Sequence, residues 1–426
     1  MSGKETLKEV IVSNENFITK DIETIVEREN IFLPAKLNKV IVFYGVRRSG
    51  KSYVLFDFFK KHKDSAVYVD FEDERLVDFG VNDFQRLKEA FFELKPHLLE
   101  KEVFLLFDEA QNIKGWESFC RRAVERENIK VFVTGSSSKV MPEEFHTSLR
   151  GRSWSIELLP FSFREYLRIK DIDLKDRSVI YGRKKPLLKK YFSEYLKWGG
   201  FPEVVLSVSE FEKRKLIKEY LEAMFFKDLV ERFDISNMHL LDSLREKIFS
   251  SFSLKFSLTA FYKQYKDKFP FSKDSLFLYY KHFLSSMLAF EVRKFSESSY
   301  KRLRNPAKIY LVDTGIAKRV TSADSGRLLE NIVFLEFRRR GGEIFYFEEK
   351  RECDFIVKDT GGSLSAYQVV WELNEENELR EIEGLREACQ SLGIKKGTIL
   401  SFDEEGEREK ENISIEIIPV WKWLLE

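Results

Sequence analysis

The sequence is poor in cysteine, and this scarcity excludes two classes of small scaffold. Only three cysteines occur among 426 residues, and none belongs to a CxxC pair. A disulfide framework needs paired cysteines, and a cysteine zinc site needs them in short spacing motifs. We therefore expect Cys120, Cys353 and Cys389 to be reduced thiols of a cytoplasmic protein.

Long apolar runs and a strong net charge are also missing. No apolar run approaches the ~18 residues that span a bilayer, and the opening MSGKETLKEV lacks the apolar core of a signal peptide. The formal net charge is +1, so no global field attracts nucleic acid or a membrane, and such a partner would require a local patch. These absences predict a soluble protein without a membrane partner.

The chain does have enough length and apolar content for several cores. Its 426 residues exceed what one core supports, which predicts two or three domains. The first half alternates short apolar runs with amphipathic stretches, a pattern typical of βαβ units around a mainly parallel sheet. The expected strands are residues 39–44, 65–71, 102–108, 130–135 and 153–159.

The octet GVRRSGKS, residues 45–52, follows the first expected strand and fits the phosphate-loop pattern G-x-x-x-x-G-K-[ST]. Gly45 permits a sharp turn, and Gly50 lets the backbone approach a phosphate. Lys51 would reach the β- and γ-phosphates of ATP, and Ser52 would ligate Mg²⁺. The following helix would direct its unpaired N–H groups at the anion. The predicted nucleotide-binding residues are Gly45, Arg48, Ser49, Gly50, Lys51, Ser52 and Tyr53.

The segment VFLLFDEAQ supplies two acids some 60 residues later. It places Asp108 at the carboxyl end of a buried parallel strand, where open α/β sheets bind their ligands. Asp108 would hold Mg²⁺ through water, and Glu109 would act as general base on the attacking water. The simpler alternative is a strand that ends in two solvated acids, but the phosphate loop upstream favours the metal and base roles.

Other polar groups follow neighbouring strands. Among Thr134, Ser136 and Ser137, one would sense the γ-phosphate, with Ser136 preferred, or they would cap a helix. Residues Asp70, Glu72 and Asp73 would either position metal and water or form an acid-rich loop.

Arginines provide a further pair of alternatives. Arg150 or Arg152 would act on the nucleotide of a neighbouring subunit, a contribution worth roughly 10³ to 10⁵ in rate, or would pair with local acids on the surface. We take Arg152 as the catalytic candidate. Arg47 and Arg48 would contact phosphate or face solvent. A homo-oligomer and a monomer both remain open.

Six motifs together carry a family resemblance. They are GVRRSGKS, LFDEAQNIKGWE, VTGSSSKV, SLRGR, ELLPFSFREYL and WGGFPEVV. Their order resembles the archaeal and bacterial ATPases of the AAA_14/DUF4143 type, an AAA+-like branch of the P-loop NTPases. The resemblance continues through residues 305–317, 326–347 and 352–357. It implies ATP binding and hydrolysis with Mg²⁺, and a helical lid in which GGFP (199–202) approaches the nucleotide.

The predicted fold class is α/β, with a P-loop NTPase parallel sheet and appended modules. The expected regions are a P-loop ATPase core at 1–165, a helical lid at 166–235, a winged-helix-like module at 236–300 and a PD-(D/E)xK-like domain at 301–426. The third helix of the winged-helix module would show the apolar and aromatic residues Leu276, Phe277, Tyr279, Tyr280 and Phe283. Because groove readers expose Arg, Lys, Asn or Gln, this helix should pack rather than read bases.

The resemblance of the tail to the nuclease fold is incomplete. Glu330 and Asp354 occupy two of the expected metal-ligand places, but the third carries Gln368, and Val370 stands where the lysine belongs. Without that lysine, the group of residues lacks the positive charge that would stabilise the transition state. Lys350 or Lys358 would have to substitute, so we favour a scaffold or partner-binding surface over an active nuclease.

Three functions follow. The first is a Mg²⁺-dependent ATPase whose hydrolysis drives motion of the appended domains on or near nucleic acid, with DNA bound through local basic patches. The second is a slow nucleotide-gated switch that binds a protein partner. The third is a nuclease controlled by ATP.

Overall fold

The computed structural model describes residues 3–34, 38–127, 129–136, 147–176, 178–296, 298, 305–320 and 324–426. The chain divides into two compact units, Met1–Leu159 and Pro160–Glu426. All three cysteines are buried and unpaired, as expected. Within the described ranges, no helix has both the length and the apolar character needed to cross a bilayer.

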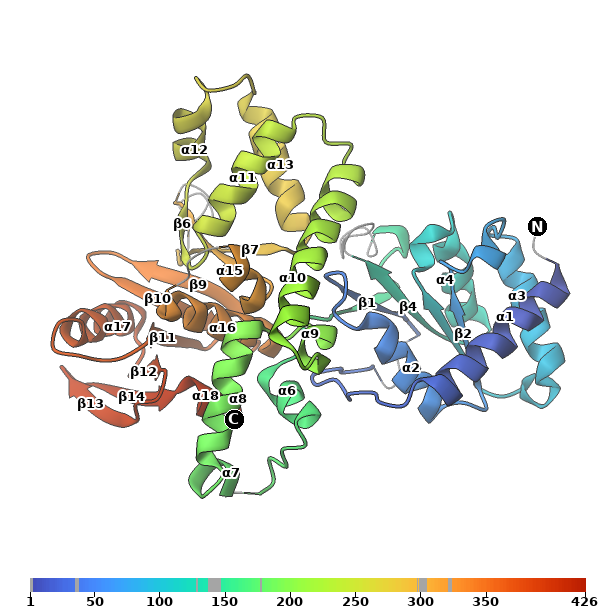
Figure 1. The fold of residues 1–426 in the computed structure, drawn as a ribbon, viewed down its shortest axis with the longest axis horizontal. Coiled ribbons are helices and arrows are strands. Elements are labelled where there is room, and N and C mark those ends of the chain that lie inside the picture. Colours follow the sequence, from blue (N-terminus) through green and yellow to red (C-terminus); the bar gives the residue numbers. More distant parts are fainter. Residues whose placement is uncertain are drawn as a thin grey trace. The chain divides into compact units, whose positions relative to one another are not determined.

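The first unit is built on a five-stranded parallel sheet (Figure 1). Its strands are β1 (Val40–Gly45), β2 (Ala66–Asp70), β3 (Phe104–Asp108), β4 (Lys130–Ser136) and β5 (Ser153–Glu157). Their order is β2-β3-β4-β1-β5, and every neighbouring pair is parallel. The prediction of a parallel sheet from five apolar runs is confirmed.

Helices cover both faces of this sheet, which explains why its central strands are mainly apolar, whereas the edge strand β5 is mostly half-buried. The helices are α1 (Lys4–Asn16), α2 (Lys51–Lys61), α3 (Asp83–Leu94) and α4 (Trp116–Arg126), with a π-helix η1 (Phe17–Asp21) after α1 and short 3₁₀ turns at Glu74–Leu76, Pro96–Leu98 and Ala110–Asn112. Val40 and Val42 belong to the core with α1, α3 and α4. Ile41 and Phe43 belong to the opposite core with α2 and η1. Alternate residues of β1 therefore pack into the two cores on opposite faces of the sheet.

The second unit contains a nine-stranded mixed sheet in the order β13-β14-β12-β11-β10-β9-β7-β8-β6. The strands are β6 (Leu254–Phe256), β7 (Ala289–Lys294), β8 (Ala307–Leu311), β9 (Glu343–Glu348), β10 (Glu352–Lys358), β11 (Leu364–Val370), β12 (Lys396–Ser401), β13 (Gly406–Lys410) and β14 (Ile413–Pro419). The strands from β6 to β8 extend the sheet of the carboxyl-terminal part, because β7 pairs in parallel with β9.

The helices of the second unit are α6 (Phe163–Ile169), α7 (Ser178–Tyr181), α8 (Lys185–Trp198), α9 (Pro202–Leu206), α10 (Glu210–Phe225), α11 (Met238–Ser250), α12 (Leu258–Tyr265), α13 (Lys273–Ser285), α15 (Thr314–Val320), α16 (Ser325–Arg340), α17 (Glu378–Leu392) and α18 (Val420–Trp423), with the π-helix η5 (Phe226–Glu231) after α10. The rings of Phe337 in α16 and Phe355 in β10 are 5.4 Å apart. The adjacent Ile356 packs instead with Leu385 of α17. Helices α16 and α17 therefore cover opposite faces of the sheet.

Residues 238–311 run in the order α11, β6, α12, α13, β7, β8. Strand β8 pairs antiparallel with both β6 and β7. In α13, Leu276, Tyr279, Tyr280 and Phe283 are buried, whereas Phe277 is 53% exposed. Four of the five apolar and aromatic side chains singled out in the sequence thus pack inside the unit.

Candidate nucleotide-binding site

The loop predicted to bind phosphate connects β1 to α2. Gly50, just before the helix, has a φ of 92°, a left-handed conformation that glycine adopts without steric cost. Lys51 is 7% exposed. Its ammonium donates hydrogen bonds to the carbonyl oxygens of Gly45 at 3.2 Å and Val46 at 3.1 Å. The lysine charge therefore lies against the loop itself, where a phosphate would be bound.

The other residues of the loop also fit a bound phosphate. The Ser49 hydroxyl is buried and has no hydrogen-bond partner, a state that an anion oxygen would relieve. Ser52 is half-buried in the first turn of α2, so its hydroxyl lies at the positive end of the helix dipole. Arg48 and Tyr53 are exposed beside it.

Two contacts of the loop were not foreseen from the sequence. A Cβ on Gly45 would lie 2.2 Å from the Leu158 carbonyl oxygen, so glycine is required there by close approach of the chain after β5. Arg28 donates from Nη1 to the Ser49 carbonyl at 2.8 Å and from Nη2 to the Leu159 carbonyl. Arg28 lies in an irregular segment without helical or strand periodicity, so no sequence signal identifies it.

Asp108 ends β3 in a fixed orientation. The carboxylate is 3% exposed. Its Oδ2 accepts a hydrogen bond from the Tyr68 hydroxyl at 2.7 Å, and its Oδ1 accepts one from the Thr134 hydroxyl. Burial, and then the charge of Asp108, raise the pKa of Tyr68 well above its ordinary value, so Tyr68 remains a proton donor. Two neighbouring strands thus hold the predicted metal carboxylate in place.

Glu109 follows directly, with a φ of 49°. Its backbone N–H donates to the Thr134 hydroxyl at 3.0 Å, and its carboxylate accepts from the Gln111 amide. Burial raises the pKa of Glu109 above its ordinary value, while the Lys51 ammonium acts in the opposite direction. The structure therefore brings Lys51, Asp108 and Glu109 together at the carboxyl edge of the sheet.

The three acids after β2 separate into different environments. Asp70 is opposite Asp108 in the β2–β3 register, and burial raises its pKa to about 6. The Glu72 backbone N–H donates to Asp70 Oδ1 at 2.8 Å. Asp73 instead pairs with Arg75 at 2.6 Å, and that hydrogen-bonded partner lowers its pKa. Asp70 lies beside the predicted metal carboxylate through its backbone register, and the charge of Glu72 acts to raise the pKa of Glu109.

The polar residues at the end of β4 also differ from one another. Thr134 is fully buried. Its hydroxyl donates to the Asp108 carboxylate and accepts from the Glu109 N–H, so Thr134 helps to orient these two acids. The backbone of Ser136 pairs with Gly45 at the start of the phosphate loop. Ser137 lies outside the described residues. The γ-phosphate-sensing role of Ser136 remains a prediction.

The two candidate arginines lie elsewhere in the first unit. The Arg152 carbonyl accepts from the Val40 N–H at 2.8 Å, which places Arg152 at the start of β1, opposite the Gly45 end. Its guanidinium pairs with Glu125 at 2.6 Å. Arg150 is exposed, with a φ of 48°. The structure does not bring Arg152 to the nucleotide loop of its own chain, so a catalytic role would require a neighbouring subunit.

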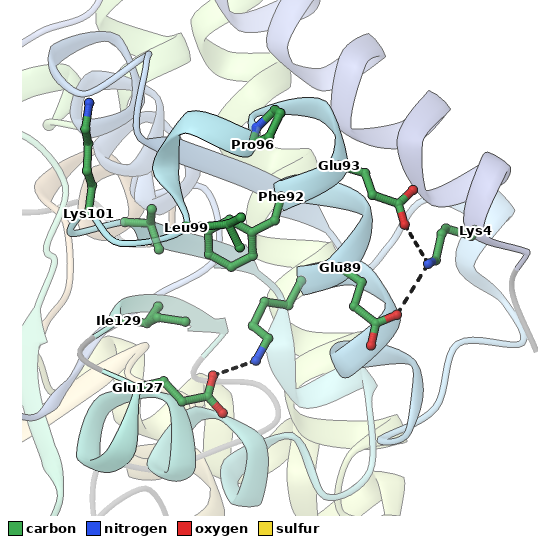
Figure 2. A pocket seen from close by; sticks show the side chains of 11 residues that line it. Lys4, Glu89, Phe92, Glu93, Pro96, Leu99, Lys101, Glu127 and Ile129 are labelled. Atoms are coloured by element: carbon green, nitrogen blue, oxygen red, sulfur yellow. Dashed lines mark hydrogen bonds and ion pairs between the residues drawn. The ribbon is translucent and has the colours of Figure 1, made fainter.

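A hollow at this opposite edge is separate from the nucleotide site (Figure 2). It is lined by Val103 and Ile129, which precede β3 and β4. At one side of it, Lys4 pairs with Glu89 at 3.4 Å and Glu93 at 2.8 Å. The hollow therefore lies at the amino ends of β3 and β4, between these residues and the helices α1 and α3.

The GGFP motif (199–202) makes close contacts within the second unit. A Cβ on Gly199 would lie 1.9 Å from Asp313 Oδ1, and one on Gly200 would lie 2.2 Å from the Phe161 carbonyl oxygen. The Gly200 N–H donates to Asp313 Oδ2 at 2.7 Å. These contacts explain both glycines by packing, while the predicted approach of the motif to a nucleotide remains a prediction.

The nuclease-like residues of the tail also come together. The Asp354 N–H donates to Gln368 Oε1 at 3.1 Å, and both Glu330 and Asp354 accept hydrogen bonds from Lys308. Val370 is buried in the apolar cluster beneath α17. Lys308 was not predicted from the sequence, although a lysine inside the apolar run AKIYL was a usable signal.

The two lysines considered as substitutes lie away from Lys308. Lys358 pairs with Glu343 at 3.5 Å at the end of β10. Lys350 is exposed, and its backbone N–H donates to Glu387 at 3.0 Å. The lysine that reaches the carboxylates is therefore supplied by β8.

Three stretches of the chain match protein families. Residues 37–167 match the AAA domain family AAA_14. Residues 189–327 match the domain of unknown function DUF8612, and residues 325–423 match the domain of unknown function DUF4143.

Individual relatives match over most of the chain. Uncharacterized protein MJ1544 of Methanocaldococcus jannaschii is 35% identical over 100% of this chain and 96% of its own length. An uncharacterized protein of Haemophilus influenzae is 27% identical over 99% of this chain and 100% of its own length. Among solved structures, the Walker-type ATPase Paby2304 of Pyrococcus abyssi aligns with 70% of this chain and 99% of its own, at 16% identity and a TM-score of 0.43. By its family matches and its archaeal relative, this chain belongs to the archaeal and bacterial P-loop ATPases of the AAA_14/DUF4143 type.

Proposed function

We propose that this protein binds ATP with Mg²⁺ and hydrolyses it, and that hydrolysis drives motion of the second unit. The observation that carries the proposal is the position of two groups at the carboxyl ends of parallel strands: the buried Lys51 ammonium, hydrogen-bonded to the Gly45 and Val46 carbonyls after β1, and the Asp108–Glu109 pair at the end of β3. The Lys51 ammonium acts to lower the pKa of Glu109, against the larger effect of burial. A phosphate-binding cation and a candidate base thus belong to one site.

The side chains would divide the chemistry among them. Lys51 would neutralise phosphate oxygens, and the amino end of α2 would offer backbone N–H donors. Ser52 and Asp108 would hold Mg²⁺, which supplies further neutralisation of the triphosphate when it is bound. Glu109 would orient a water molecule and accept its proton. Its fixed backbone link to Thr134 keeps this carboxylate next to Asp108.

ATP turnover by the full chain, measured with and without DNA and over a range of protein concentrations, tests this proposal. We expect Mg²⁺-dependent release of phosphate. A rate per subunit that rises with concentration would support an arginine acting between subunits. DNA stimulation that weakens steeply with added salt would identify phosphate contacts. Absence of turnover under all these conditions would contradict the proposed hydrolysis.

A second candidate, a slow nucleotide-gated switch that binds a protein, is favoured by the surface of α13. Phe277 and Leu278 are 53% and 50% exposed on this helix, and Lys273, Asp274 and Lys281 are exposed around them. A surface of exposed apolar side chains among charges of both signs is better suited to binding a protein partner than to binding a DNA groove. Turnover that is slow and indifferent to DNA would favour the switch over the nucleic-acid ATPase.

A further inference from the structure

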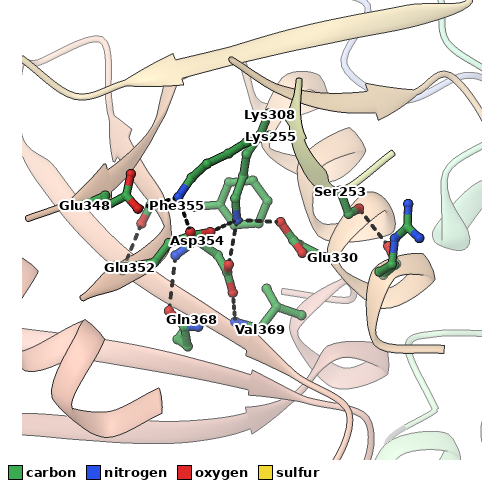
Figure 3. A network of polar contacts seen from close by, with 12 residues as sticks. Ser253, Lys255, Lys308, Glu330, Glu348, Glu352, Asp354, Phe355, Gln368 and Val369 are labelled. Carbon is green, nitrogen blue, oxygen red and sulfur yellow. Dashed lines mark hydrogen bonds and ion pairs between the residues drawn. The ribbon is translucent and has the colours of Figure 1, made fainter. Parts of the chain in front are cut away.

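A buried lysine occupies the centre of the nuclease-like carboxylates (Figure 3). Lys308 on β8 is 3% exposed. Its ammonium lies 3.1 Å from Glu330 Oε1, 2.6 Å from Glu352 Oε1 and 2.8 Å from Asp354 Oδ1. Tyr310, two residues along the same strand, donates to Glu330 Oε1 at 2.6 Å. Carboxylates from α16 and β10 thus converge on a single nitrogen.

The donors of this ammonium are fully used. A lysine ammonium has three N–H groups, and here three carboxylates accept from or pair with it. No donor remains to activate water or hold a scissile phosphate, which is the role expected of a nuclease lysine. Lys308 is therefore placed as a structural cation rather than a migrated catalytic group.

The surrounding structure fixes the carboxylates in this arrangement. Asp354 Oδ2 accepts from the Val369 N–H at 3.0 Å. Glu352 also pairs with Lys255 at 2.6 Å, at the more exposed rim of the cluster. Each group has a protein partner, as buried charges require.

With the Lys308 ammonium in place, the cluster offers no position for Mg²⁺. The ammonium occupies the point on which the oxygens of Glu330, Glu352 and Asp354 converge, at hydrogen-bond separations of 2.6 to 3.1 Å, whereas Mg²⁺ would have to lie ~2.0–2.1 Å from such oxygens. In the part of the chain that the structure describes, no group of three or more acidic, histidine or cysteine side chains is arranged to hold a metal. The metal that a nuclease-like fold implies therefore does not fit these residues as they stand.

We propose that Lys308 takes the place of the divalent metal in the nuclease-like sheet, which excludes metal and phosphodiester cleavage and ties β8 to α16 and β10. The ammonium supplies one positive charge where a catalytic site needs a divalent ion with open coordination positions. Strand β8 pairs with β6 and β7, so the same contact joins residues 238–311 to the carboxyl-terminal sheet.

Removal of the ammonium should convert the cluster into a metal site. In the full chain, Lys308→Ala should lower Tm in EDTA, because three buried carboxylates lose their partner. Addition of Mn²⁺ should restore Tm and give calorimetric binding at least tenfold tighter than in the wild type. Lys255→Ala, which removes the rim lysine from Glu352, serves as the matched control and should respond to Mn²⁺ as the wild type does.

Two further variants keep the test decisive. Lys308→Ala combined with Asp354→Asn should lose the Mn²⁺ response. If Lys308→Ala folds only with Mn²⁺, the proposal is supported. A folded Lys308→Ala protein that ignores Mn²⁺ would overturn it. The proposal would also be overturned if the wild-type protein bound Mn²⁺, or cleaved DNA with Mn²⁺, and Asp354→Asn abolished that activity. This comparison of wild type with Asp354→Asn tests the proposal even if Lys308→Ala does not fold.

Discussion

Glu109→Gln should bind ATP as tightly as the wild type and lose nearly all turnover. The amide keeps the size and the backbone link of Glu109 to Thr134, but it cannot accept a proton from water. Loss of a general base typically reduces the rate by about 10² to 10⁴. The measurement is phosphate release under saturating ATP, together with ATP affinity by calorimetry.

Glu102→Gln is the matched control, because Glu102 is exposed and lies just before the opposite, amino end of β3. It should leave both affinity and rate unchanged. Normal turnover by Glu109→Gln would show that another group serves as the base. Loss of ATP affinity in the same variant would instead give Glu109 a binding role.

Lys51→Ala should weaken ATP binding severely, by about 10- to 150-fold, since hydrogen bonds to charged groups contribute about 1.5–3 kcal/mol. In the present structure this ammonium donates to two loop carbonyls. The lysine is therefore already held within the loop, and a bound phosphate would replace these carbonyls as its partner. The expected loss is measured by calorimetric titration with ATP and Mg²⁺.

Lys60→Ala removes an exposed lysine from the other end of α2 and controls for the change in net charge. It should bind ATP normally. Unchanged affinity in Lys51→Ala, with Tm equal to that of the wild type, would place the phosphates away from this loop.

The fold of the first unit was predictable because its signals are local. Five apolar runs gave the five strands of the parallel sheet, and glycines with a lysine marked the turn before α2. The second unit was harder, because its sheet joins strands distant in sequence. The pairing of β7 with β9 and of β8 with β6 depends on contacts that no periodicity reveals.

The site was predictable where a motif carries the chemistry, as for Lys51, Asp108 and Glu109. The supporting contacts were not. Tyr68 is only one of several aromatic residues in apolar strands, and its bond to Asp108 follows from the alignment of β2 with β3. Lys308 was overlooked because its carboxylate partners are at least 22 residues away in the sequence.

The most direct test of the central claim is a crystal structure of the full chain with Mg²⁺ and a nonhydrolysable ATP analogue. The account predicts a triphosphate cradled by residues 45–52, with the Lys51 ammonium on its outer phosphates, and with Asp108 and Glu109 facing the metal and the γ-phosphate. An analogue bound elsewhere, with this loop still closed on its own lysine, would contradict it.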